Sequence, residues 1–420
     1  MTRNFFLTCD PLTAERLSWI TDVLKFYCAH LHPESLHHHP RKTTPAFSFF
    51  LTGDALYSLV DKRCLHYWDL LFLLPPFRCV YDSRELALRG ISLEPQKIKF
   101  SDQLIPGETP GIPKGAESGG DPFWDRLLKT CRDDETDSPV AGFLQLESPY
   151  MHRSSVYALR FLEAAVRAGV SPDLYTYLDG IHLGHANQDP SEFENIGKGL
   201  TAVHESAAKK GLHSLQLACS RCAVARGYRA FENSQGEVIS NCTIPPFRIR
   251  NLNEIVARFE RDHLIASRGA FTIRFPKEEN PIPAGQSSGK RQPAPIVILI
   301  TRSPYESEMA FGGLSFAIAC AFRKIPVRVV FIEDGVYALA GSHQLREDET
   351  IFNIQDIIRM STTVTPPVET YVYHPSFQHR GITKHGTLSG ILAIGSRDLA
   401  KLLLMPPARS KAQFQRVILF

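Results

Sequence analysis

The chain of 420 residues is 43% hydrophobic and 22% charged, an ordinary composition for a soluble globular protein of two to four domains. Its net charge is only +3, which argues against a nucleic-acid-binding or membrane-surface protein. No apolar run approaches the roughly 18–20 residues of a membrane span, and the N-terminal residues do not resemble a secretory leader. Nine cysteines, an odd number, do not suggest a secreted disulfide framework, so we expect a cytoplasmic protein.

The predicted elements begin with a strand at 5–7, a helix at 14–29 and a second strand at 47–51. Two stretches rich in proline, glycine and serine, 103–121 and 276–294, predict linkers or loops. They divide the chain into three blocks of similar size.

The second block alternates strand and helix patterns. Strands are expected at 140–147, 173–179 and 213–218, helices at 153–168, 191–210, from 221 and at 252–263, and a last apolar run at 271–275. Such alternation predicts parallel strands with right-handed crossovers, in a doubly wound α/β domain.

The second and third blocks share landmarks at a nearly constant offset of 155 residues. The matched pairs are Ser148-Pro149-Tyr150 with Ser303-Pro304-Tyr305, Asp179-Gly180 with Asp334-Gly335, and, at an offset of 154, Arg226-Gly227 with Arg380-Gly381. A nearly constant offset over some 80 residues indicates a duplicated fold.

The first block follows the same plan more loosely. Its segment Asp54-Ala55-Leu56-Tyr57 mirrors the Asp334 segment, and Arg89-Gly90 closes the set after a shorter interval. We therefore predict three domains of one kind, listed here by range: 1–135 with an inserted loop at 101–120, 138–275, and 295–420.

Function in open parallel sheets collects at the loops that follow the carboxyl ends of the strands. In the second block these loops are Ser148–Tyr150, Asp179–His182 and Cys219–Cys222. A cysteine between a strand and a helix faces unpaired N–H groups and the positive end of the helix dipole, and both stabilise a thiolate. Cys219 is therefore the candidate nucleophile, and Arg221 and Arg226 could add positive charge.

Other interpretations of these residues stay open. Cys219 could be a small buried hydrophobic residue, or it could form a redox pair or half of a zinc site with Cys222, although no second CxxC is present. His182 could act in a pocket or serve only the shape of the loop. The histidines between His30 and His39 fit a solvated loop better than a metal site. Motifs for nucleotide-driven or hydrolytic chemistry are missing from the sequence, so we expect no cofactor and no metal.

The segment LQLACSRCAVARGY at 215–228 resembles the DsrE/TusD subunit of sulfur-relay complexes, in which the active cysteine precedes an Arg-Gly pair by seven residues. Cys219 matches that cysteine, with Arg226-Gly227 as the pair. The third block, from ITRSPYESEMAFGG at 300–313 onward, looks like the DsrF/TusC subunit. The first block, with DPFWDRLLKT at 121–130, is similar to the small DsrH/TusB subunit.

The resemblance implies a cytoplasmic carrier of sulfane sulfur, held as a persulfide on Cys219 and passed between a TusA-like donor and a DsrC/TusE-like acceptor. Asp82 and Tyr373 occupy the matching positions of the other blocks and cannot carry sulfur. Because the family assembles two copies of three subunits, we expect a homodimer, without direct contact to nucleic acid or membrane.

Residues of the expected binding surface are Ser148, Tyr150, Asp179, Gly180, His182, Arg221, Arg226 and Gly227. The alternatives are a non-catalytic binding or assembly protein and a dithiol oxidoreductase that uses Cys219 and Cys222.

Overall fold

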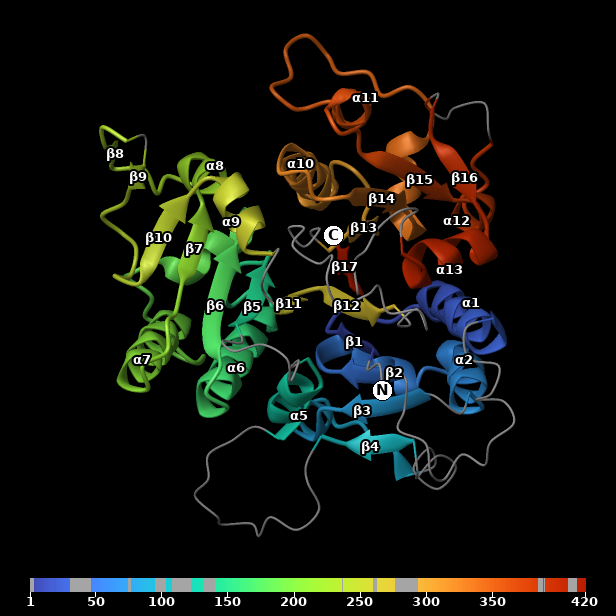
Figure 1. Ribbon diagram of the computed structural model, residues 1–420, viewed down its shortest axis with the longest axis horizontal. Helices are drawn as coiled ribbons and strands as arrows, with labels where there is room; N and C mark the ends of the chain where they lie inside the picture. Colours follow the sequence, from blue (N-terminus) through green and yellow to red (C-terminus); the bar gives the residue numbers. More distant parts are fainter. Residues whose placement is uncertain are drawn as a thin grey trace, which may run out of the picture.

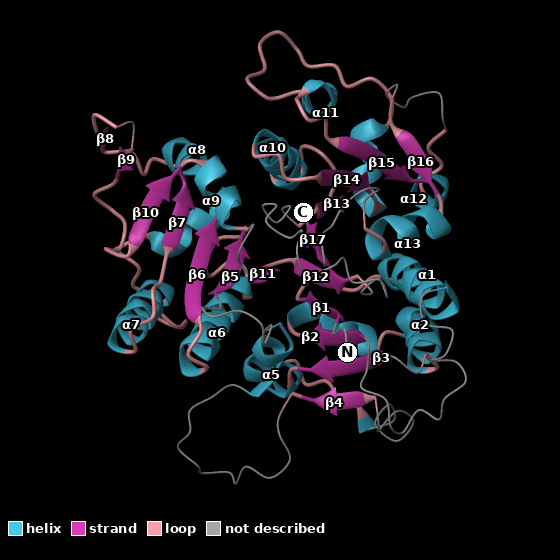
Figure 2. Cartoon of the chain, in the orientation of Figure 1, coloured by secondary structure: helices cyan, strands magenta, loops and turns pink. Residues whose placement is uncertain are grey.

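The computed structural model shows a mixed α/β chain in which helices flank two large sheets (Figures 1 and 2). It describes residues 4–30, 47–74, 77–94, 103–107, 122–131, 140–235, 237–259, 263–275, 294–383, 388, 390–406 and 414–420. The histidine-rich segment after His30, most of the loop expected at 101–120 and nearly all of the linker expected at 276–294 lie outside these residues.

The second block holds a sheet of five parallel strands in the order β10-β7-β6-β5-β11. The strands are β5 (Val140–Gln145), β6 (Ser171–Thr176), β7 (Gln216–Cys219), β10 (Phe247–Arg250) and β11 (His263–Ala266). Its helices are α6 (Ser154–Arg167), η3 (Leu178–Gly184), α7 (Ile196–Lys209), α8 (Ser220–Ala225) and α9 (Leu252–Arg258), and β8 (Phe231–Glu232) pairs with β9 (Val238–Ile239). The parallel arrangement agrees with the alternation in the sequence.

The other sheet has ten strands in the order β16-β15-β14-β13-β17-β12-β1-β2-β3-β4. Its strands are β1 (Asn4–Thr8), β2 (Phe47–Leu51), β3 (Phe77–Tyr81), β4 (Leu104–Pro106), β12 (Gly269–Arg274), β13 (Ile296–Ile300), β14 (Val327–Phe331), β15 (Glu369–Tyr373), β16 (Leu392–Ile394) and β17 (Phe414–Leu419).

Helices of the first and third blocks flank this sheet. They are α1 (Ala14–His30), η2 (Gly53–Leu59), α2 (Lys62–Phe72), α3 (Ser83–Leu88), α5 (Pro122–Cys131), α10 (Met309–Phe322), η4 (Glu333–Leu339), α11 (Ile354–Thr363), α12 (His374–His379) and α13 (Ser396–Leu404).

The expectation of a separate sheet in each block is wrong for the first and third blocks, because β12 joins them. This strand contains most of the apolar run expected at 271–275, within the predicted second domain, yet it pairs antiparallel with both β1 and β17. Among the described residues of the first block, no strand follows α5 to cover the edge of β1. An open strand edge presents unpaired N–H and C=O groups, and β12 satisfies them.

The repeat is visible in unusual backbone angles. Leu178 and Glu333, separated by 155 residues, have positive φ angles of 53° and 54°, and Gly53 matches them in the first block at 59°. Tyr150 and Tyr305 form a second such pair, at 69° and 70°. Non-glycine residues seldom adopt this conformation, so its recurrence at equivalent positions indicates a shared local structure.

The three blocks form a closed ring, with the second block (green) at the left of Figure 1, the third (orange to red) above and the first (blue) below. At each seam the last helix of one block packs against the first helix of the next. The contacting pairs are α5 with α6, α9 with α10, and α13 with α1.

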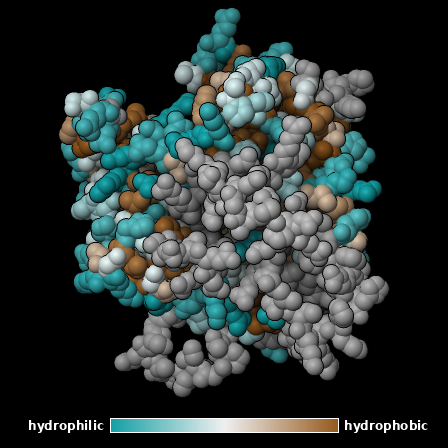
Figure 3. Space-filling view, in the orientation of Figure 1, coloured by the Kyte–Doolittle hydropathy of each residue, from teal (hydrophilic) through white to brown (hydrophobic). Residues whose placement is uncertain are grey.

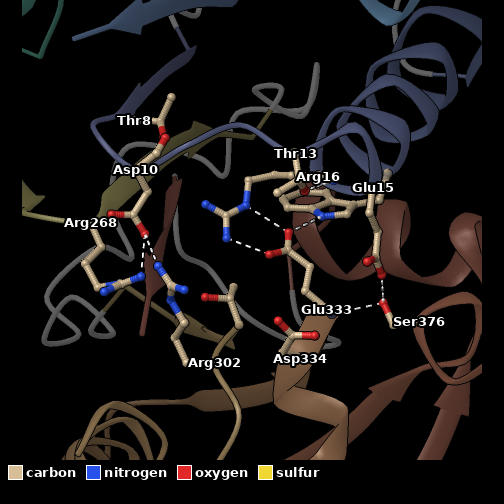
Figure 4. Close-up of polar contacts among 12 residues, drawn as sticks. Thr8, Asp10, Thr13, Glu15, Arg16, Arg268, Arg302, Glu333, Asp334 and Ser376 are labelled. Atoms are coloured by element: carbon tan, nitrogen blue, oxygen red, sulfur yellow. Dashed lines mark hydrogen bonds and ion pairs between the residues drawn. The ribbon is translucent and has the colours of Figure 1, made fainter. Parts of the chain in front are cut away.

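Buried charges link the first and third blocks, as the close-up in Figure 4 shows. The Arg16 guanidinium on α1 binds the carboxylate of Glu333 at 2.6 Å, and Trp19 Nε1 donates to the same carboxylate at 3.1 Å. Nearby, Asp10 after β1 accepts from Arg268. Because burial removes these charges from water, loss of one partner would leave the other charge buried and uncompensated.

Hydrophobic residues reach the visible surface in small groups between hydrophilic ones (Figure 3). Within the described ranges, the structure contains no helix that is both long and apolar enough to cross a membrane.

Candidate functional site

The site expected in the second block lies where β6 and β7 end. Asp179 and Gly180 fall in η3, directly after β6, and Cys219 is the last residue of β7. A side chain at Gly180 would place its Cβ 2.1 Å from the backbone oxygen of Gln145. The Asp-Gly landmark is therefore required by a close approach of two backbone segments, and the same holds for Gly335, at 1.9 Å from the oxygen of Ile300.

Cys219 caps the N-terminus of α8 with φ −64° and ψ 121°. Its counterpart Asp82 caps α3 with similar angles, −78° and 104°, and its carboxylate accepts from the backbone N–H groups of Arg84 and Glu85, both at 3.1 Å. The first block therefore holds a carboxyl group, as a hydrogen-bond acceptor, at the position of Cys219. Neither Cys219 nor Tyr373, the third counterpart, makes a side-chain cap hydrogen bond within the described part of the chain.

The environment of Cys219 favours its thiolate form. Hydrogen bonding to the Cys222 side chain lowers the pKa of Cys219 from 9.0 to about 7, against the opposing effect of burial. The backbone N–H groups of Cys222 and Arg221 and the Arg221 charge act in the same direction. The side chain is only 1% exposed, so a reaction partner reaches this sulfur only after a local opening.

Cys222 also has a structural task. Its sulfur accepts from the backbone N–H of Leu178 at 3.3 Å, and in the third block Ser376 accepts from Glu333 N in the same way at 2.9 Å. Each acceptor fixes the left-handed residue that follows the second strand. Hydrogen bonding to Cys219 and burial raise the pKa of Cys222, so this thiol stays protonated.

Arg226 is committed to carboxylates rather than turned to the sulfur. It binds Asp179 and, across the seam, Glu308 of the third block, both at 2.6 Å. The same internal pair recurs as Arg89–Asp54 at 2.9 Å and as Arg380–Asp334 at 2.8 Å.

The Arg-Gly landmark is thus a structural tie between the third helical element and the turn after the second strand. Gly227 completes it, because its φ of 79° suits glycine at the end of α8.

Arg221 lies on the exposed surface of α8, with its guanidinium carbon 5.3 Å from the ring centre of Phe311 in α10. His182 is placed beside Tyr228, with 2.8 Å between His182 Nδ1 and the Tyr228 hydroxyl, and burial lowers the pKa of His182. These contacts favour a positioning role for His182 over acid–base work.

The loop after β5 turns toward the other seam. The Tyr150 hydroxyl donates to Gln188 at 2.6 Å, and its ring lines a cavity of about 230 Å³ together with Arg84 and Arg153 at the boundary with the first block. Ser148 is half-buried in the same loop. Of the predicted set, Asp179, Gly180, Arg221, Arg226 and Gly227 lie in η3, in α8 or just after it, next to the strand end that carries Cys219, whereas the Tyr150 ring lines the cavity at the boundary with the first block.

Sequence reasoning missed the residues that the third block contributes. Glu308 reaches Arg226, Phe311 reaches Arg221, and Tyr177 donates its hydroxyl proton to the backbone oxygen of Gly312 at 3.2 Å. Nothing in the local pattern of α10 distinguishes these positions, because their role depends on the closure of the ring. Among the described residues, no group of three or more histidine, cysteine or acidic side chains could hold a metal ion.

Comparison with known proteins gives a family match for the third block. Residues 294–405 match the model of the DsrE/DsrF-like family, a family generally related to sulfur relay. No curated protein matches the chain. Among solved structures, the chain is similar to the YchN protein from E. coli, with 24% identity over 30% of this chain and 99% of that protein, at a TM-score of 0.25. The family match covers the third block and not the block that carries Cys219.

Proposed function

We propose that the protein carries sulfane sulfur as a persulfide on Cys219. The observation that carries the proposal is the position of this thiol at a helix cap, where the first block holds the carboxylate of Asp82 and where the pKa of Cys219 is lowered to about 7. A thiol with a pKa near ambient pH is both ionised and nucleophilic enough for exchange.

The transfer involves no net oxidation. The Cys219 thiolate attacks the outer sulfur of a donor persulfide, the donor's S–S bond breaks, and the donor leaves as a thiolate. The product, Cys219–S–S⁻, is an anion stabilised by the same N–H groups and the same positive charge as the thiolate. An acceptor thiolate then removes the outer sulfur in the same way and regenerates Cys219.

The resemblance of the blocks to sulfur-relay subunits supports a TusA-like protein as donor and a DsrC/TusE-like protein as acceptor. It also supports a cytoplasmic location and a homodimer, in which two rings would reproduce a complex with two copies of each subunit. Sedimentation at micromolar concentration tests the dimer, and a monomer would contradict it.

A second function, dithiol oxidation and reduction, is favoured by one observation. Cys219 and Cys222 are separated by two residues, and the interaction of their side chains moves their pKa values in opposite directions. Oxidation to a disulfide would remove two protons and two electrons, which a disulfide substrate would accept as it is reduced to two thiols.

Intact-mass analysis separates these functions. After incubation with a persulfide donor, a gain of about 32 Da supports the carrier, a loss of about 2 Da the redox pair, and no change a binding protein. We expect the gain, lost in Cys219→Ser and kept in Cys222→Ser, because serine at 222 can still pair with Leu178 as Ser376 does with Glu333. Loading of sulfur on Cys219→Ser at another cysteine would overturn the assignment.

A further inference from the structure

The first seam, where the first and second blocks meet, contains a cavity of about 230 Å³. Both blocks form its wall. Arg84 of α3 comes from the first block, and Val156 of α6 comes from the second. Two aromatic rings, Tyr150 and Phe193, also line the cavity, with their centres 6.0 Å apart. None of these side chains takes part in the sulfur chemistry proposed for Cys219, so the cavity is a separate site.

The internal repeat shows what occupies the equivalent space at the second seam, between the second and third blocks. Val156 corresponds to Phe311 at the offset of 155 residues. Glu194 corresponds to Phe352, because each directly precedes the asparagine that caps the next helix. Phe311 and Phe352 stack on one another, with their ring centres 4.4 Å apart. The first seam therefore has a valine and a glutamate in place of two stacked rings.

The backbone framework around the two spaces is the same. The Tyr150 hydroxyl accepts from the backbone N–H of Ile196 at 3.4 Å, and the Tyr305 hydroxyl accepts from that of Ile354 at 3.3 Å. Since protein interiors are normally packed without voids, the first seam is left open because the framework is kept while the two rings are missing.

Arg84 also lacks the stacking partner that its counterpart has. Arg84 in α3 and Arg221 in α8 are each the second residue after a helix cap, and Arg221 lies 5.3 Å from the centre of the Phe311 ring. The Arg84 side chain makes no ion pair or ring contact with any residue that the structure describes. The other two arginines that line the cavity, Arg153 and Arg160, are both bound to glutamates. The Arg84 guanidinium is therefore available to a ligand.

We propose that the cavity at the first seam binds a small planar aromatic anion. The ring of the ligand takes the place that Phe311 and Phe352 occupy at the second seam, and its acidic group pairs with Arg84, since a guanidinium binds both aromatic faces and carboxylates. The cavity is smaller than the roughly 300–1,000 Å³ of sites for drug-sized ligands, so the ligand has only one or two rings. Glu192 also lines the cavity, which favours a single negative charge over a polyanion.

The test is isothermal titration of the full chain with 1-naphthoate and with its neutral counterpart 1-naphthamide. We expect 1-naphthoate to bind at one site, and 1-naphthamide to bind about fivefold more weakly because it cannot form the ion pair. Arg84→Gln should weaken the binding of 1-naphthoate by about the same factor and leave that of 1-naphthamide unchanged. Val156→Phe places in the cavity the ring that the second seam already accommodates, and it should abolish the binding of both compounds.

The matched control is Arg63→Gln, which removes an exposed arginine of the same block that does not line the cavity, and it should bind 1-naphthoate as the parent does. The proposal is overturned if the parent shows no saturable binding, if Val156→Phe binds like the parent, or if Arg63→Gln loses as much affinity as Arg84→Gln. If Val156→Phe does not fold, Val156→Leu replaces it, with at least a partial loss of binding expected. The assay involves no sulfur, so its outcome is independent of the function proposed for Cys219.

Discussion

Stability should depend on pH through Cys219, in a window set by its lowered pKa. The pKa falls from 9.0 in the unfolded chain to about 7 in the folded one. Folding therefore stabilises the thiolate, relative to the thiol, by about 3 kcal/mol. A group with a depressed folded pKa contributes its full stability above the unfolded value. It loses that contribution as the pH falls through the folded value.

The perturbation is Cys219→Ser, which removes the titrating group. The free energy of unfolding of the parent, minus that of the variant, should rise by about 1 kcal/mol between pH 6 and pH 8. The raised pKa of Cys222 does not disturb this window, because that thiol stays protonated there in both states. Any constant cost of replacing sulfur by oxygen cancels, because only the pH dependence of the difference is used.

Urea denaturation under reducing conditions, repeated at pH 6, 7 and 8, measures this difference. The control is Cys320→Ser, because burial raises the pKa of Cys320 and its thiol does not titrate in this range. The reasoning is refuted if the difference for Cys219→Ser stays flat within about 0.3 kcal/mol over two pH units. An alkylation midpoint of Cys219 above pH 8.5 would refute it independently.

Two further predictions test the fold. Gly180→Ala should destabilise the protein by about 1–3 kcal/mol in urea denaturation, because the added Cβ would meet the Gln145 oxygen. Gly227→Ala should cost only about 1 kcal/mol, because no atom lies within 4 Å of its added Cβ. Equal effects of the two substitutions would contradict the packing argument. Arg16→Met should lower the free energy of unfolding by about 3–5 kcal/mol, because it leaves the Glu333 carboxylate buried without its ion pair. This loss should shrink at pH 4, since protonation of Glu333 removes the carboxylate charge. A loss that does not change with pH would count against that cause.

Much of the local structure could be predicted from the sequence because it repeats. The offset of 155 residues identified equivalent turns, and the structure gives each a physical reason. Gly180 and Gly335 avoid a backbone oxygen, and Arg226 and Arg380 tie the turn to the next helix. These requirements arise within one block, so they recur in the sequence at the same offset, although the sequence does not say which partner each side chain contacts.

The position of Cys219 between a strand and a helix was likewise readable from the sequence, because helix caps depend on neighbouring residues. The direction of the Arg226 side chain could not be predicted from the sequence. Its two partners differ in kind, since Asp179 belongs to its own block and Glu308 arrives from the next one. Whether the Arg226 guanidinium binds a thiolate or a carboxylate depends on which of them lies closer. The sequence pattern does not give that distance.

By itself the sequence determined the α/β alternation, the repeated turns and the cysteine at a helix cap, because each depends on contacts within one block. The tertiary structure alone decided that β12 leaves its block to join the sheets of the first and third, and that α10 brings Glu308 and Phe311 to the cap of Cys219. These outcomes follow from ring closure, in which open strand edges and helix ends must be covered by whichever surface fits them. Such surfaces are formed by residues far apart in the chain, and no local pattern records which of them will meet.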